Sequence, residues 1–162
     1  MPDDADLFTL DLPDADATAR LGETFAALVL PGDVLLLDGP IGAGKTHFAR
    51  ALIRARLGSA EDVPSPTFTL VQTYGAEPEI WHADLYRLTH PDEAIELGLD
   101  EAFDTAICLV EWPERLGQDQ PEKALSLRFS LENGGASRRV RLCGGPDWAA
   151  RLDSLEAGFH GN

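Results

Sequence analysis

Residues 39–46 have the composition and spacing of a loop that binds phosphate groups. They read GPIGAGKT and fit the pattern G-x-x-x-x-G-K-S/T, in which backbone N–H groups surround the phosphates of a nucleotide. The glycines allow the positive φ and the close backbone approach that such a loop requires. Lys45 would place its ammonium group on the β- and γ-phosphates, and the Thr46 hydroxyl would be a magnesium ligand. The segment therefore predicts nucleotide binding.

The segments on either side of this loop match the strand and the helix that must hold it. Residues 34–37 form a short apolar run of the length of a buried parallel strand. After the loop, apolar residues recur with the spacing of one helix face, at Phe48, Ala51, Leu52 and Ala55. Strand, loop and helix thus come in the order that aims a helix N-terminus at a bound anion.

Two acidic residues end predicted strands and are candidates for a magnesium site. Glu111 follows the apolar run at residues 107–110, and Asp84 follows residues 80–83. The carboxyl ends of parallel strands open on one edge of a sheet, where a nucleotide site needs an acidic group near Mg²⁺. We favour Glu111 as the magnesium-associated acid, directly or through water, and Asp84 as the residue that orients the metal or the attacking water. Each side chain alone is equally compatible with a polar cap at a strand end.

A threonine and a histidine are weaker candidates for the same site. Thr67 lies in the sequence SPTF, where its hydroxyl could report on the γ-phosphate, although a plain turn explains the segment equally well. His82 shares a strand face with Asp84, and a histidine there is more typical of a hydrogen-bonded structural residue than of a base.

The chain has two lysines, Lys45 and Lys123, and no N-K-x-D motif, so we expect ATP and not GTP.

The remaining patterns predict an α/β fold. Asp14 or Asp16 would cap the first helix. We expect helices at residues 17–30 and from Pro91, strands at residues 67–71 and 125–131, and a hairpin that turns at residues 133–135 toward Val140 and Leu142. Together these elements predict a three-layer domain of the phosphate-loop NTPase type, with a mainly parallel central sheet and an antiparallel C-terminal hairpin. We expect one domain over residues 1–162, with loose tails at residues 1–6 and about 155–162.

Composition and charge argue against nucleic acids and membranes as direct partners. The formal charge is −15, so the chain offers no broad phosphate-neutralising surface, and independent binding of DNA or RNA is disfavoured. No apolar run approaches the roughly 20 residues that span a bilayer, and the N-terminus is acidic where a signal peptide would be basic. Cys108 and Cys143 lie far apart, which is typical of buried thiols in a reducing compartment. We therefore expect a cytoplasmic protein without a membrane partner.

Four motifs in a fixed order give the chain a family resemblance. They are GPIGAGKT, then SPTFTLV at residues 65–71, HADLYRL at residues 82–88 and LVEWPE at residues 109–114. This set resembles the bacterial TsaE family, also called YjeE, over roughly residues 12 to 145. The resemblance implies a small ATPase, with ATP and Mg²⁺ as cofactors, that is needed to form N6-threonylcarbamoyladenosine at position 37 of tRNAs that read ANN codons.

The resemblance also implies partners. These are TsaD, which transfers the threonylcarbamoyl group, and TsaB, which pairs with TsaD. A protein of this family reaches tRNA only indirectly, through those partners, and its ATP cycle resets the complex between turnovers. The acidic balance of the chain agrees with this interpretation, because such a protein needs no basic groove of its own.

The resemblance further assigns residues to the site. The nucleotide-binding set comprises Gly39, Gly42, Ala43, Gly44, Lys45, Thr46 and His47. Glu111 matches the magnesium-associated acid, Asp84 the acid of the H-x-D block, and Thr67 the switch threonine. A family arginine near the late hairpin maps to Arg138 or Arg139, of which we assign Arg139 to the nucleotide site. We expect catalytic roles for Lys45, Thr67, Asp84 and Glu111, and metal ligation by Thr46, Asp84 and Glu111.

Two other functional classes share the loop and the acid. A small-molecule kinase would add arginines that clamp the acceptor, a role open to Arg87 and Arg115, and would form a transfer product from ATP. A non-hydrolysing nucleotide-gated adaptor would bind ATP and partners without useful turnover. The ATPase is the favoured interpretation because no second recognition motif is evident.

Overall fold

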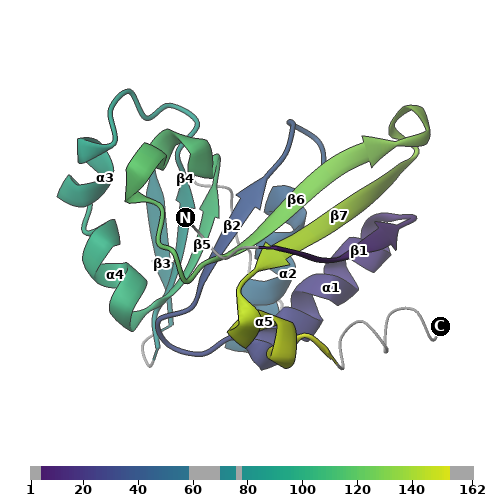
Figure 1. Cartoon of the computed structure of the whole chain (residues 1–162), viewed down its shortest axis with the longest axis horizontal. Coiled ribbons are helices and arrows are strands. Elements are labelled where there is room, and N and C mark those ends of the chain that lie inside the picture. The colour runs from purple at the N-terminus through teal and green to yellow at the C-terminus, as the bar shows by residue number, and fades with distance from the viewer. Residues whose placement is uncertain (1–4, 59–69, 76–77, 154–162) are drawn as a thin grey trace.

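The computed structural model describes residues 5–58, 70–75 and 78–153. In these ranges, strands form one mixed sheet with the order β1-β7-β6-β2-β5-β4-β3 (Figure 1). The strands are β1 (Ala5–Leu12), β2 (Val34–Asp38), β3 (Val71–Tyr74), β4 (Ile80–Asp84), β5 (Ile107–Glu111), β6 (Leu125–Glu132) and β7 (Ser137–Gly144). The helices are α1 (Ala15–Leu28), α2 (Lys45–Leu57), α3 (Asp92–Glu96), α4 (Leu99–Thr105) and α5 (Pro146–Arg151), with the 3-10 helices η1 (Pro113–Asp119) and η2 (Asn133–Gly135). None of these helices is long and apolar enough to cross a membrane.

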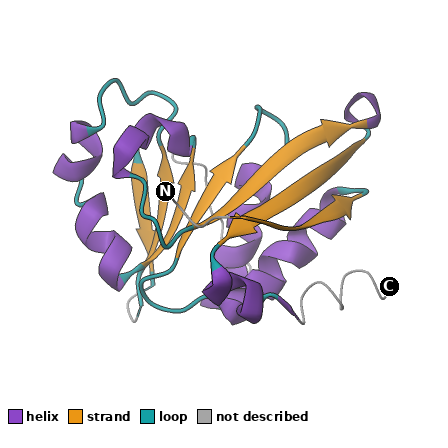
Figure 2. Ribbon diagram, viewed as in Figure 1, coloured by secondary structure: helices purple, strands orange, loops and turns teal. Residues whose placement is uncertain are grey.

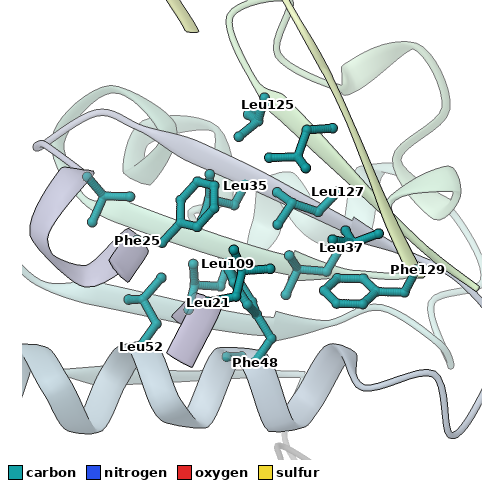
Figure 3. Close-up of a cluster of buried hydrophobic side chains, with 14 of the residues drawn as sticks. Leu21, Phe25, Leu35, Leu37, Phe48, Leu52, Leu109, Leu125, Leu127 and Phe129 are labelled. Carbon is teal, nitrogen blue, oxygen red and sulfur yellow. The ribbon is translucent and has the colours of Figure 1, made fainter. Parts of the chain in front are cut away.

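Alternate side chains of the central strands enter two hydrophobic clusters, one on each face of the sheet. On β2, Leu35 and Leu37 pack with residues of α1 and α2, whereas Val34 and Leu36 pack with residues of α3, α4 and η1. Figure 3 shows Leu35 and Leu37 in the first cluster, together with Phe25 of α1. Because both faces are covered, β2 and β5 are apolar up to their last residue. The predicted three-layer α/β fold is confirmed.

The centre of the sheet is parallel and its two sides are antiparallel. β4, β5, β2 and β6 run parallel to one another, whereas β3 is antiparallel to β4, and β7 is antiparallel to both β6 and β1. The predicted C-terminal hairpin is confirmed, with β6 and β7 joined by η2 (Figure 2). In the parallel centre, Glu111 lies opposite Leu37 on one side and Asp84 on the other. The carboxyl ends of β2, β5 and β4 therefore meet at one edge of the sheet.

Helix α1 packs closely on α2, the helix that follows the loop. A Cβ atom on Gly22 would lie 2.6 Å from the carbonyl oxygen of Phe48, so the absence of a side chain permits this approach. Asp14 caps α1, since its carboxylate accepts a hydrogen bond of 2.9 Å from the backbone N–H of Ala17. Because of this cap, α1 begins at Ala15, two residues before the predicted start at residue 17. The helix ends at Leu28, two residues before the predicted end at residue 30.

Other elements also differ from the sequence predictions. β1 begins at Ala5, inside the segment expected to be loose, because its backbone pairs with β7 late in the chain. The predicted strand at residues 67–71 falls mostly outside the described residues, and β3 begins at Val71. Pro91 precedes α3, while α4 and α5 have no counterpart among the predicted elements. Residues 155–162 lie outside the described ranges. Cys108 and Cys143 are buried free thiols, as predicted.

Candidate functional site

The segment between β2 and α2 has the conformation predicted for a phosphate-binding loop. Gly42 and Gly44 have φ of 85° and 105°, in the left-handed region that favours glycine. Gly39 lies so close to β6 that a Cβ atom would be 2.5 Å from the carbonyl oxygen of Phe129. Ala43 is fully buried, so its side chain anchors the loop to the core. The order of strand, loop and helix expected from the sequence is confirmed.

Lys45, the first residue of α2, is almost completely buried beside this loop. Its Nζ atom donates to the carbonyl oxygen of Gly39 at 2.5 Å and lies 3.5 Å from the centroid of the Trp112 ring. Burial lowers the pKa of Lys45, and nearby carboxylates, Glu111 first among them, oppose this shift. The ammonium group is therefore poorly solvated, and in such a place its attraction for a phosphate is stronger than in water.

Thr46 and Glu111 meet directly at the carboxyl edge of the sheet. The Thr46 hydroxyl donates to the Glu111 carboxylate, at 2.8 Å from Oε1 and 3.0 Å from Oε2. Glu111 is the last residue of β5 and is 2% exposed, whereas Thr46 lies in the first turn of α2. Strand pairing and the start of α2 thus bring together two of the three residues that were predicted to lie near magnesium.

Asp84 joins this pair from the end of β4, opposite Glu111. Its Oδ1 atom accepts a hydrogen bond of 3.1 Å from the backbone N–H of Tyr86. Burial raises the pKa of the Asp84 carboxyl, and the nearby charge of Glu111 raises it further. Both carboxylates line the same cavity as the loop, so the second predicted acid also belongs to the site.

The oxygen donors at this edge fit Mg²⁺. This ion prefers oxygen ligands, keeps several waters, and is usually held by one or two carboxylates together with substrate phosphates. The Thr46 hydroxyl and the carboxylates of Glu111 and Asp84 supply such oxygens. Among the described residues, no group of three or more His, Cys, Asp or Glu side chains could hold a metal by itself. The donor set therefore suits a magnesium ion that arrives with a nucleotide.

A cavity of about 800 Å³ extends from these residues toward α1 and the hairpin. Its lining includes most of the predicted nucleotide set, namely Gly42, Gly44, Lys45, Thr46 and His47. The start of α1 forms a wall that the sequence analysis does not identify, made by Asp14, Ala15 and Thr18. His47 adjoins this wall, with Nε2 at 3.1 Å from the carbonyl oxygen of Ala15. Thr67 lies outside the described residues.

Arg138, and not Arg139, lies at the loop. The Nε atom of Arg138 donates to the carbonyl oxygen of Gly42 at 2.9 Å, and its side chain lines the cavity. Arg139 lies in a second, separate hollow, where its Nε atom is 2.9 Å from Asp11 and Nη1 is 3.3 Å from Glu132. Successive side chains of a strand point to opposite faces of the sheet, so Arg138 and Arg139 lie in different places although they are neighbours in the sequence. The structure therefore places Arg138, and not the predicted Arg139, beside the loop.

Two aromatic residues that follow the acids also line the cavity. Tyr86 and Trp112 have ring centroids 4.9 Å apart, and Tyr86 is 47% exposed. His82, by contrast, is fully buried, with its Nε2 atom 2.7 Å from Oε2 of Glu111. His82 is thus buried and hydrogen-bonded, and its partner is the predicted magnesium-associated acid.

Comparison with known proteins gives the family of the chain. The family model of the threonylcarbamoyl adenosine biosynthesis protein TsaE matches residues 12–140. The tRNA threonylcarbamoyladenosine biosynthesis protein TsaE of Rickettsia bellii is 38% identical over 117 residues, which cover 72% of this chain and 81% of that protein. Its namesake from Rickettsia conorii is 44% identical over 100 residues, which cover 61% of this chain and 57% of that protein's length.

A solved structure agrees with these sequence matches. The crystal structure of YdiB from Bacillus subtilis superposes with a TM-score of 0.75, covers 96% of each chain and is 28% identical in sequence. The Bacillus subtilis protein TsaE is 40% identical over 115 residues, 69% of this chain and 70% of that protein. Loop, acids, fold and sequence thus agree, and the chain belongs to the TsaE family.

Proposed function

We propose that this chain is an ATPase that serves the formation of the threonylcarbamoyl group on N6 of adenosine 37 in tRNAs reading ANN codons. It binds ATP and Mg²⁺ at the loop, and ATP binding and hydrolysis act on a complex of TsaD and TsaB. The observation that carries the ATPase role is the contact between Thr46 and Glu111 beside Lys45 in one cavity. Membership of the TsaE family supports the link to tRNA modification.

The loop and the first turn of α2 supply positive charge for the phosphates. The N-terminus of α2 carries a partial positive charge, and no acidic residue occupies its first turn. The Lys45 ammonium group has three donors, so it can keep the Gly39 carbonyl while it donates to the β- and γ-phosphates. Arg138 holds the Gly42 carbonyl and steadies the loop from the hairpin side.

Thr46 and Glu111 would hold magnesium, directly or through water. When bound, the ion would supply positive charge that stabilises the negative charge of the γ-phosphoryl group during its transfer. Glu111 can serve this role because it is buried at a strand end, where its carboxylate has little freedom to move. Phosphoryl transfer is catalysed mainly by positioning and charge stabilisation, so a carboxylate that is held in one position would contribute directly to catalysis.

Asp84 is our candidate for the residue that orients the attacking water. It lines the cavity next to Glu111, and its raised pKa makes it a stronger base than an ordinary aspartate. Thr67 keeps the role of the family's switch threonine in this proposal. Together these residues form the set that would carry ATP hydrolysis.

The charge of the chain supports indirect contact with tRNA. With a formal charge of −15, the protein offers no broad phosphate-neutralising surface, so partner proteins would have to supply the phosphate contacts. We therefore include TsaD and TsaB as partners, and we place the protein in the cytoplasm with the tRNA pool.

Turnover of Mg-ATP tests the proposed function. We would measure phosphate release by the chain alone and by the chain with its TsaD–TsaB pair, using Lys45→Ala as the control. We expect stimulation by the pair that disappears in Lys45→Ala and without Mg²⁺. Phosphate transfer to a small acceptor would instead indicate a kinase. Tight ATP binding without turnover in any complex would indicate an adaptor and would contradict the roles given to Glu111 and Asp84.

A further inference from the structure

His82 lies in the interior next to Glu111 and is not among the residues that line the cavity. It belongs to β4 and is 0% exposed. In the pairing of β4 with β5, His82 lies opposite Leu109, and Asp84 lies opposite Glu111. Alternate residues of a strand share a face, so His82 and both acids lie on the same side of the sheet. From there the Nε2 atom of His82 reaches Oε2 of Glu111 at 2.7 Å.

Packing alone does not account for an imidazole at this position. The Nδ1 atom of His82 is buried and has no hydrogen-bond partner among the described residues. Burial of an unpaired polar atom costs free energy that an aliphatic side chain of similar size would not cost. The interaction that offsets this cost is the short hydrogen bond to Glu111, which is shielded from water.

The Glu111 carboxylate is held from two sides. The Thr46 hydroxyl donates to it from the first turn of α2, at 2.8 Å from Oε1 and 3.0 Å from Oε2, and His82 approaches Oε2 from the interior. A carboxylate only accepts hydrogen bonds, so the imidazole donates through Nε2. The last torsion of a glutamate side chain is broad, and a single partner leaves the plane of the carboxylate poorly defined. Two partners on different sides define that plane.

We propose that His82 is a positioning residue, which fixes the Glu111 carboxylate so that Oε1 faces Thr46 and the metal that accompanies the nucleotide. This role rests on the proposed function, because His82 acts only through the acid assigned to magnesium. Groups that orient metal ligands affect metal affinity without touching the metal. His82 thus extends the site into the core of the protein.

Two substitutions separate the hydrogen-bond donor from the bulk of the side chain. His82→Gln keeps an N–H group at about the reach of Nε2, whereas His82→Leu keeps the bulk and removes the donor. Ile80→Ala is the matched control for a loss of stability. Ile80 lies on the same face of β4, is 2% exposed, and carries no polar atom that could hold Glu111.

The readout is the effect of Mg²⁺ on the affinity of the full chain for ADP, measured by titration calorimetry. The thermal unfolding of each variant is measured in parallel as a check on its stability. For the wild-type protein we expect ADP to bind more tightly when Mg²⁺ is present. His82→Leu should raise the Mg²⁺ concentration needed for half of this effect by about 10- to 100-fold, the usual cost of losing a partner of a metal ligand. His82→Gln and Ile80→Ala should respond to Mg²⁺ as the wild type does. If His82→Leu fails to fold, His82→Asn replaces it, because its shorter amide does not reach the place of Nε2.

Four results would overturn the positioning role. A wild-type Mg²⁺ response in the donor-free variant would leave the ATPase proposal standing and remove His82 from it. An equal loss in Ile80→Ala, or a full loss in His82→Gln, would show that packing and not the hydrogen bond matters. An ADP affinity of the wild-type protein that ignores Mg²⁺ would overturn both this role and the proposed magnesium site.

Discussion

The Nζ atom of Lys45 lies 3.5 Å from the centroid of the Trp112 ring. Trp112 comes directly after Glu111 and holds this place with φ of 59°, an uncommon value for a residue with a side chain. A cation above an indole ring is attracted by the negative face of the ring. The residue that follows the proposed magnesium-associated acid therefore also contacts the lysine of the loop, and one short segment links both parts of the candidate site.

This contact predicts a fluorescence signal for nucleotide binding. Of the three tryptophans, Trp112 is the one that lines the cavity. We expect added Mg-ATP to change the tryptophan emission, because the ring adjoins the lysine that faces the phosphates. The change should vanish in Trp112→Phe and persist in Trp81→Phe, as measured by titration of each variant. A signal that survives in Trp112→Phe would place the nucleotide away from this ring.

The two neighbouring arginines of β7 should differ in their effect on nucleotide binding. Arg138→Gln removes the guanidinium that holds the Gly42 carbonyl, and we expect it to weaken ATP binding by about ten-fold, the worth of one charge-assisted hydrogen bond. Arg139→Gln should leave the affinity unchanged, because Arg139 pairs with Asp11 and Glu132 in a separate hollow. Calorimetric titration of both variants measures the contrast. The reverse order of effects would restore Arg139 to the site.

The raised pKa of Asp84 predicts how stability depends on pH. The folded protein holds the Asp84 proton more tightly than the unfolded chain, whose carboxyl has the ordinary pKa of 3.8. This contribution to stability is therefore lost as the pH rises from 3.8 through the folded pKa. Asp84→Asn cannot ionise and keeps an oxygen acceptor for the Tyr86 N–H. We expect it to be more stable than the wild type at neutral pH, with a smaller difference in acid, and to lose ATP turnover.

Unfolding by urea at several pH values measures this difference. The stability advantage of Asp84→Asn should shrink steadily as the pH is lowered through 3.8, because the wild-type carboxyl is protonated in both states only below that value. A constant difference over the whole range would mean that the carboxyl of Asp84 does not ionise differently in the folded protein.

Gly22 should be intolerant of a side chain. In Gly22→Ala, the new Cβ atom would lie 2.6 Å from the Phe48 carbonyl oxygen, and a backbone atom cannot move away as a flexible side chain can. We expect a loss of about 1–3 kcal/mol in the free energy of unfolding, typical of an overpacked core. Gly145→Ala is the control, since nothing lies within 4 Å of its added Cβ atom, and it should change stability by less than about 0.5 kcal/mol. Equal effects would refute the close α1–α2 contact.

The elements that hold the loop are those with strong local signals. β2 and β5 are continuous apolar runs because both faces of the sheet are covered. Of the four periodic residues of α2, Phe48 and Leu52 lie in one cluster, whereas Ala55 is exposed. Gly42 and Gly44 are required by the backbone conformation itself. For these reasons the loop, Lys45, Thr46 and Glu111 are found from the sequence.

The parts that the sequence analysis misses depend on contacts between distant segments. β1 exists because it pairs with β7, which no local pattern reveals. The choice between Arg138 and Arg139 depends on the face of a strand, which changes with each residue. The spacing of His82 and Asp84 shows that they share a face, but the pairing of β4 with β5 decides that His82 reaches Glu111. Local chemistry is thus predictable, whereas register across the sheet is not.

The central claim is tested most directly by counting threonylcarbamoyladenosine formed on tRNA per molecule of TsaD. The reaction contains TsaD, TsaB, a threonylcarbamoyl donor, Mg-ATP and either this chain or its Glu111→Gln variant. We predict product in excess of TsaD with the wild-type chain, and product that stops near one equivalent with Glu111→Gln, because the complex is then not reset. Excess product of equal amount with both proteins would contradict the claim that ATP hydrolysis at this site drives the cycle.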